Sequence, residues 1–137
     1  MNTTVNTHQA LIYVMVTMTA VDARIGDAEL QRIGRLVQTL PVFEDFDPER
    51  LTHIAQECGE ILQVDEGLNA VLGLVSQALP EYLRATAYAL AVEVAISDQR
   101  IWKEEVRFLA RLRDTLDLDK LTIAAIERAA SARYHKA

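Results

Sequence analysis

The sequence predicts an all-α fold: a single seven-helix bundle with internal pseudo-twofold symmetry, built from duplicated three-helix units. Hydrophobic residues recur at steps of three and four, as in Leu30, Ile33, Leu36 and Leu40, which is typical of amphipathic helices. Signals for strands are weak, because no Asn-Gly or Asp-Gly turn occurs and alternation is brief. The second half of the chain also repeats the first, which indicates an internal duplication.

We expect helices over residues 7–21, 27–39, 48–63, 66–79, 81–96, 103–115 and 118–133. The first and fifth are apolar nearly all round, which places them in the centre of the bundle, while the second and sixth carry one apolar stripe each. The third and seventh follow Asp47 and Asp117, which are predicted N-caps. The fourth ends near Pro80 and links the units. The whole chain, 1–137, is therefore expected to be one domain with repeat units 7–63 and 81–133 and a linking helix over 66–79.

The repeat becomes visible when the chain is aligned on itself. Identical residues then meet in pairs: Asp22 with Asp98, Arg24 with Arg100, Ile25 with Ile101, and Glu29 with Glu105. The apolar stripes coincide as well, because Leu30, Ile33, Leu36 and Leu40 meet Val106, Leu109, Leu112 and Leu116. Each copy thus predicts a buried helix, a tight turn and an amphipathic helix.

Composition excludes several classes of function. The net charge of −6 gives no general attraction to nucleic acid or to an anionic membrane. The apolar run from Ala10 to Val21 is shorter than the roughly 20 residues of a spanning helix, and no Lys or Arg precedes it as in a secretory signal. The single cysteine, Cys58, cannot form an internal disulfide, which fits a reducing compartment. We therefore expect a cytoplasmic protein with no nucleic-acid partner and no membrane insertion.

The repeated element reads D-x-R-I-x-x-x-E, from Asp22 to Glu29 and from Asp98 to Glu105. An acid that leaves one helix and an acid in the first turn of the next can face each other, and their oxygens suit a hard cation such as Ca²⁺ or Mg²⁺. The spacing imitates the second half of an EF-hand loop. The first half is missing, because its ligand positions fall on Met18 and Ala20 in one copy and on Val94 and Ile96 in the other.

Helix capping is the alternative interpretation of the same residues. Gly26 can act as N-cap, Glu29 can return a hydrogen bond to the cap, and Asp22 can pair with Arg24. Trp102 is a poor cap in the second copy, so capping explains Glu105 less easily. Both interpretations stay open at this point.

Glu93 is the fifth candidate ligand. It is one charge inside an otherwise apolar helix, and such a charge is costly to bury unless it is paired or neutralised. It precedes Asp98 by about one turn of helix and can reach the same patch, or else it reaches solvent at the rim of the bundle.

Other signals are weaker. Glu49, His53 and Glu57 share one helix face and are more typical of a solvated face than of a metal site, because no further His or Cys ligands accompany them. Cys58 lies on an apolar stripe and is expected in the core. The acidic loop around Glu44 and Asp45 is flanked by Phe43 and Phe46, which either contact a partner or pin the loop to the core.

Two copies of A-x-D-x-x-I-x-x-x-E, at Ala20 to Glu29 and, with Ile96 in place of the first Ala, at Ile96 to Glu105, resemble the TerB-like family of tellurite-resistance proteins. The resemblance implies a small seven-helix bundle, mostly cytoplasmic in bacteria and linked to tellurite and other stresses. It also implies that Asp22, Glu29, Asp98 and Glu105 form an acidic patch for divalent cations. Family members often have Asp-Gly where this chain has Asp22-Ala23 and Asp98-Gln99, so its turns lack the freedom of glycine.

Together these features predict a non-enzymatic stress or tellurite-resistance module whose acidic turns bind a divalent cation or a protein partner. The alternative is a helical interaction scaffold in which the motif acids are only caps and salt bridges. No nucleophile, cofactor motif or His-based dyad accompanies the carboxylates, which argues against an enzyme. The sequence names no cofactor other than the candidate cation, and a homodimer is left open.

Overall fold

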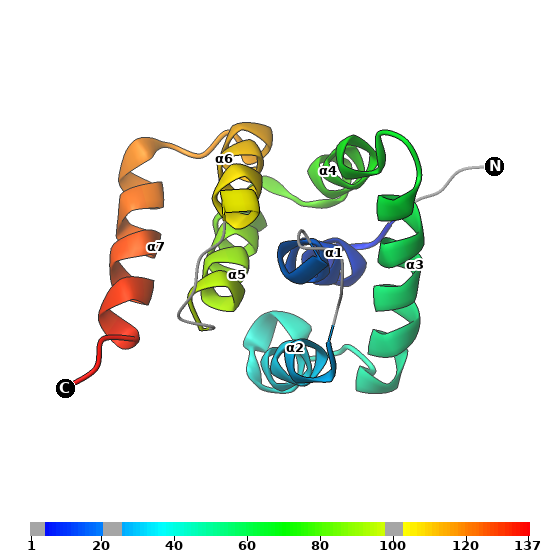
Figure 1. The fold of residues 1–137 in the computed structure, drawn as a ribbon, viewed down its shortest axis with the longest axis horizontal. Coiled ribbons are helices and arrows are strands. Elements are labelled where there is room, and N and C mark those ends of the chain that lie inside the picture. The colour runs from blue at the N-terminus through cyan, green and yellow to red at the C-terminus, as the bar shows by residue number, and fades with distance from the viewer. Residues whose placement is uncertain (1–4, 21–25, 98–102) are drawn as a thin grey trace.

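The computed structural model describes residues 5–20, 26–97 and 103–137, and these residues form seven α-helices and no strand (Figure 1). The helices are α1 (Thr7–Ala20), α2 (Asp27–Thr39), α3 (Leu51–Gln63), α4 (Gly67–Ala78), α5 (Arg84–Ser97), α6 (Lys103–Leu116) and α7 (Lys120–Arg133). Short 3-10 turns occupy Pro41–Phe43, Pro48–Arg50 and Glu81–Leu83. The predicted all-α class and the order of the seven helices are confirmed.

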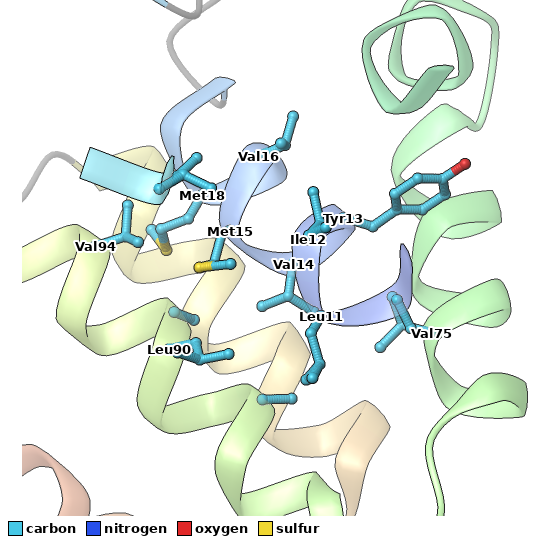
Figure 2. Close-up of a cluster of buried hydrophobic side chains, with 14 of the residues drawn as sticks. Leu11, Ile12, Tyr13, Val14, Met15, Val16, Met18, Val75, Leu90 and Val94 are labelled. Carbon is cyan, nitrogen blue, oxygen red and sulfur yellow. The ribbon is translucent and has the colours of Figure 1, made fainter. Parts of the chain in front are cut away.

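The helices α1 and α5 form the centre, as their apolar sequences predict. Every residue of α1 from Ala10 to Thr19 is buried, and α1 packs against α3, α4 and α5. Figure 2 shows Met15 and Met18 of α1 pointing toward α5, where Leu90 and Val94 lie. Since both central helices are enclosed by others, they need no polar face.

The outer helices cover this pair in a similar way in the two halves. Helix α3 packs on α1 at one end of the molecule, and α7 packs on α5 at the other (Figure 1). Helix α2 packs on α1, and α6 packs on α5. The duplication itself stays a prediction, because the turns that align best lie within 21–25 and 98–102, outside the described residues.

The prediction that Asp117 caps the seventh helix is wrong. Asp117 has a positive φ of 53° and ends α6 instead. The N–H of Asp117 donates to the carbonyl oxygen of Asp114 at 3.2 Å, and the N–H of Leu118 donates to the carbonyl oxygen of Arg113 at 3.4 Å. This pair of hydrogen bonds is the Schellman pattern. The N-cap is Asp119, whose side chain accepts from the N–H of Thr122. In the first half Asp47 caps the 3-10 turn Pro48–Arg50 that leads into α3, because its side chain accepts from the N–H of Glu49.

The predicted stripe of α6 is also partly wrong. Val106 is 52% exposed, and the buried face of α6 consists of Glu105, Phe108, Leu112 and Leu116. Leu112 and Leu116 belong to both the predicted and the observed buried face of α6. The two faces therefore differ only nearer the start of the helix. There Glu105, a charged residue, takes the inward position that Val106 was expected to hold.

The acidic loop after α2 is held by its two phenylalanines. Phe43 and Phe46 are both buried and their rings contact each other and the ring of His8. The Nε2 atom of His8 lies 2.9 Å from the carbonyl oxygen of Val42, which fixes the imidazole. Of the two interpretations of this loop, the structure supports the one in which Phe43 and Phe46 pin it to the core.

None of the helices among the described residues has both the length and the apolar character that crossing a membrane requires.

Candidate functional site

Each acidic turn of the sequence falls between the end of a buried helix and the start of an amphipathic one, in the segments 21–25 and 98–102, which are outside the described residues. Helix α1 ends at Ala20 and α2 begins at Asp27, while α5 ends at Ser97 and α6 begins at Lys103. Two of the five candidate ligands, Asp22 and Asp98, lie outside the described residues. The site is therefore built here from the other three, Glu29, Glu93 and Glu105.

Glu29 lies in the first turn of α2 and is half-buried. Gly26 is the N-cap, with extended backbone angles and no side-chain oxygen of its own to cap the helix. The carboxylate of Glu29 folds back over Gly26 so closely that a β-carbon at residue 26 would collide with its Oε2 atom. A negative charge in this place is stabilised by the helix dipole, so the geometry fits the capping interpretation of Glu29.

Glu105 is the counterpart of Glu29 in the repeat, yet its environment differs. Its residue is only 7% exposed, and it shares the buried face of α6 with Phe108 and Leu112. A carboxylate in such surroundings is stable only when another group compensates it, and Glu105 does have an interaction partner. The two motif glutamates are thus not equivalent, because one lies at a half-exposed helix start and the other is inside.

Glu93 forms a polar contact between α5 and the end of α7. Its side chain is 13% exposed, and its Oε1 atom lies 2.7 Å from Nη1 of Arg133. The hydroxyl of Tyr134 donates a hydrogen bond to Oε2. This hydrogen bond, with a smaller effect of burial, raises the pKa of Tyr134. Both carboxylate oxygens of Glu93 are therefore engaged by groups of the chain itself.

A cleft beside Glu93 carries further positive charge. Tyr134 and Glu93 line it together with Arg32 and Arg35 of α2. A cation in this cleft would have to displace Arg133 from Glu93 and withstand repulsion from these guanidinium groups. These surroundings fit an ion-paired clamp, in which Arg133 and Tyr134 bind Glu93 and join α5 to the end of α7, better than a cation ligand.

The structure does not bring Glu29, Glu93 and Glu105 together as one centre. Across residues 5–20, 26–97 and 103–137, no three His, Cys, Asp or Glu side chains are grouped so that they could hold a metal ion. A cation site at either turn would therefore need Asp22 or Asp98, whose surroundings are outside the described residues. The assignment of the five carboxylates as metal ligands stays a prediction.

Two weaker candidates have the structural roles that the sequence favoured. His53 lies 3.4 Å from Glu57, one turn away, and the two side chains are 72% and 41% exposed, as expected of a solvated face. Cys58 is fully buried, 3.6 Å from the hydroxyl of Thr17. Burial raises the pKa of its thiol to about 11, although the contact with Thr17 acts in the opposite direction. A neutral, enclosed thiol of this kind is unsuited to nucleophilic attack.

A second polar cluster, which the sequence did not reveal, joins α5, α6 and α7. The hydroxyl of Tyr88, whose residue is fully buried, donates to Glu127 and accepts from Nη1 of Arg113 at 3.1 Å. Arg113 also lies 3.0 Å from Glu127. No local pattern reveals this cluster, because its members come from α5, α6 and α7.

Comparison with known proteins supplies the family. The chain matches the family described as Tellurite resistance protein TerB over residues 8–128, a range that includes both acidic turns. Searches of curated proteins and of solved structures found no match. Since the family match covers most of the chain, this protein belongs to the TerB family of tellurite-resistance proteins.

Proposed function

We propose that this protein is a cytoplasmic, non-enzymatic stress or tellurite-resistance module whose two acidic turns bind a divalent cation or a protein partner. The observation that carries the proposal is the family match over residues 8–128, which includes Asp22, Glu29, Asp98 and Glu105. The family's description as tellurite-resistance proteins supports the cellular role, and the four carboxylates support the binding of a divalent cation.

The described helices are compatible with a cation at each turn. Glu29 and Glu105 both lie in the first turn of a helix that starts right after an acidic turn. Carboxylate oxygens are the ligands that Ca²⁺ and Mg²⁺ prefer. A hard cation would also offset the mutual repulsion of acids in a protein of net charge −6. Because Glu29 is half-exposed and Glu105 is buried, we expect the two turns to differ in affinity.

A helical interaction scaffold is the second candidate. It is favoured by two contacts already described: Glu29 covers the N-cap Gly26, and Glu93 is bound by Arg133 and Tyr134. In this case the motif acids would stabilise helices and would give no response to cations. Replacing Glu29 or Glu105 by Gln would then cost about 0.5 to 2 kcal/mol of stability and nothing else.

Isothermal titration calorimetry with Ca²⁺, Mg²⁺, Mn²⁺ and Zn²⁺ separates the two candidates. The proposal predicts heat and a rise in melting temperature for the wild type, and loss of both in the double variant Asp22→Asn, Asp98→Asn. The matched control is Glu44→Gln with Asp45→Asn, which removes the same charge from the exposed loop after α2. Equal cation binding by both double variants, or no binding by the wild type, would show that the acidic turns do not bind a cation.

The cellular role needs a separate test. A bacterial host that lacks a TerB protein is given the wild-type chain or the Asp22→Asn, Asp98→Asn variant, and growth is measured on tellurite. We expect resistance with the wild type and a lower tolerated tellurite concentration with the variant at equal protein level. Full resistance with the variant would show that the acidic turns are not needed for this role.

A further inference from the structure

A cleft of about 380 Å³ lies among α1, α3, α4 and α6, and none of its lining residues is shared with the cleft beside Glu93. Its innermost residues are Thr17 of α1 and Phe108 of α6, both about 1% exposed. Leu62 of α3 and Leu68 of α4 form its sides and are half-buried. Small-molecule sites are typically mostly apolar hollows of roughly 300 to 1,000 Å³ with a few polar groups, and this cleft fits that description.

The charged groups of the cleft all come from the exposed side of α6. They are Glu104, Arg107 and Arg111, so the charged rim has one more positive than negative side chain. The protein as a whole carries a net charge of −6. A positive rim on an apolar cleft therefore stands out from its surroundings and favours an anionic group at the opening.

The two arginines are arranged so that an anion between them is favourable. Arg107 and Arg111 are one helical turn apart, and like charges at this spacing repel each other. Arg111 donates to the side-chain oxygen of Asn69 on α4, which holds the guanidinium in place and leaves its charge uncompensated. The amide nitrogen of Asn69 donates in turn to Glu66. Arg107 has no hydrogen bond or ion pair with any of the described residues. A carboxylate is a planar anion whose two oxygens match the fork of guanidinium N–H groups.

We propose that this cleft binds a free medium-chain aliphatic carboxylate. The hydrocarbon chain lies against Leu62, Leu68 and Phe108, and the carboxylate lies between the guanidinium groups of Arg107 and Arg111. The small volume favours one free ligand over a helix of a partner protein, which needs a groove several turns long. The proposed ligand is opposite in charge to the cation of the proposed function, and Glu104 on the rim of the cleft directly precedes Glu105 of the second acidic motif.

The test is calorimetric titration of the full chain with decanoate below its micelle concentration. Decanol and decyltrimethylammonium, which share the chain and lack the negative charge, are titrated in parallel. We expect decanoate to bind at least tenfold more tightly than either, and hexanoate to bind more weakly than decanoate because it covers less apolar surface. The affinity for decanoate should also fall as salt is added.

Variants on the exposed rim test the site without disturbing the core. Arg107→Gln and Arg111→Gln should each weaken decanoate binding by about tenfold, since each removes a charge-assisted hydrogen bond. Glu104→Gln should strengthen it several-fold by removing the opposing charge. Arg128→Gln is the matched control, because Arg128 is an exposed arginine on α7, and it should leave the affinity unchanged.

Three results would overturn the proposal. The first is the same affinity for decanoate in Arg107→Gln, Arg111→Gln and Arg128→Gln. The second is decanol binding as tight as that of decanoate, and the third is no binding of decanoate while an acidic amphipathic peptide does bind. Circular dichroism of each variant shows whether it is folded. Cation titration of Arg107→Gln keeps this test independent of the proposed function, because its cation response should equal that of the wild type.

Discussion

Replacing Glu93 by Gln removes one charge from the contact between α5 and the end of α7 and leaves the shape of the side chain. The hydrogen bond from Tyr134 then changes from a charge-assisted bond to a neutral one, which costs about 1 kcal/mol. The ion pair with Arg133 is lost as well, but the Arg133 side chain is 65% exposed, so its loss adds about 0.5 kcal/mol or less. We expect the free energy of unfolding to fall by about 1 to 1.5 kcal/mol in a urea titration.

A double-mutant cycle isolates the hydrogen bond. Glu93→Gln and Tyr134→Phe should cost less in combination than the sum of the two single changes, with a coupling of about 0.5 to 1 kcal/mol. Glu60→Gln is the control, because Glu60 is an exposed acid on α3, and it should lie within about 0.5 kcal/mol of the wild type.

The same variant decides between the clamp and the cation ligand for Glu93. If the carboxylate is a clamp, Glu93→Gln lowers stability and leaves the heat of cation binding unchanged. The reasoning would be refuted by a variant that is as stable as the wild type and has lost its cation response.

Three further outcomes follow from the buried groups. Burial and the hydrogen bond to Glu127 raise the pKa of Tyr88 from 10.0 to about 12, so its contribution to stability is complete below pH 10 and is lost as pH rises toward 12. The unfolding free energy should therefore drop over this window by about 2 to 3 kcal/mol more in the wild type than in Tyr88→Phe, as measured by urea titrations at each pH. Cys58, fully buried with its pKa raised to about 11, should react with iodoacetamide at least about a hundredfold more slowly in the native protein than in urea, and equal rates would contradict its place in the core. Phe43→Ala should lower the free energy of unfolding by about 3 to 5 kcal/mol in calorimetric melting, because the ring is 2% exposed; a cost below about 1 kcal/mol would show that the loop is not pinned by this ring.

The fold could be predicted in detail because periodicity reports burial directly. The central positions of α1 and α5 follow from helices that are apolar on all sides, and most helix ends lie within two residues of the expected ones. The errors occur at helix ends, where two local patterns compete. Asp117 and Asp119 are both good N-caps by type, and the choice was made by the Schellman turn that ends α6 at Asp117.

The candidate site was only partly predictable, since its contacts join distant parts of the chain. The sequence identified Glu93 as a charge in need of a partner, but its partners, Arg133 and Tyr134, come from the far end of the chain. The poor cap Trp102 already indicated that Glu105 differs from Glu29, but the sequence did not predict that Glu105 is buried. The inward position of Glu105 depends on the rotation of α6 against its neighbours, which no local pattern encodes.

The cleft on α6 was missed for a similar reason. Arg107 and Arg111 are ordinary surface residues in a sequence of alternating charge. Only the packing of α4 against α6 places them at the opening of an apolar hollow with Leu68 on its side.

The central claim is that the acidic turns hold a cation, and anomalous X-ray diffraction from crystals grown with Mn²⁺ tests it most directly. The account predicts an anomalous peak within bonding distance of the carboxylates of Asp22 and Glu29, or of Asp98 and Glu105, which is absent from crystals of the Asp22→Asn, Asp98→Asn variant. Well-ordered turns without a peak at either place, in crystals that contain millimolar Mn²⁺, would contradict it.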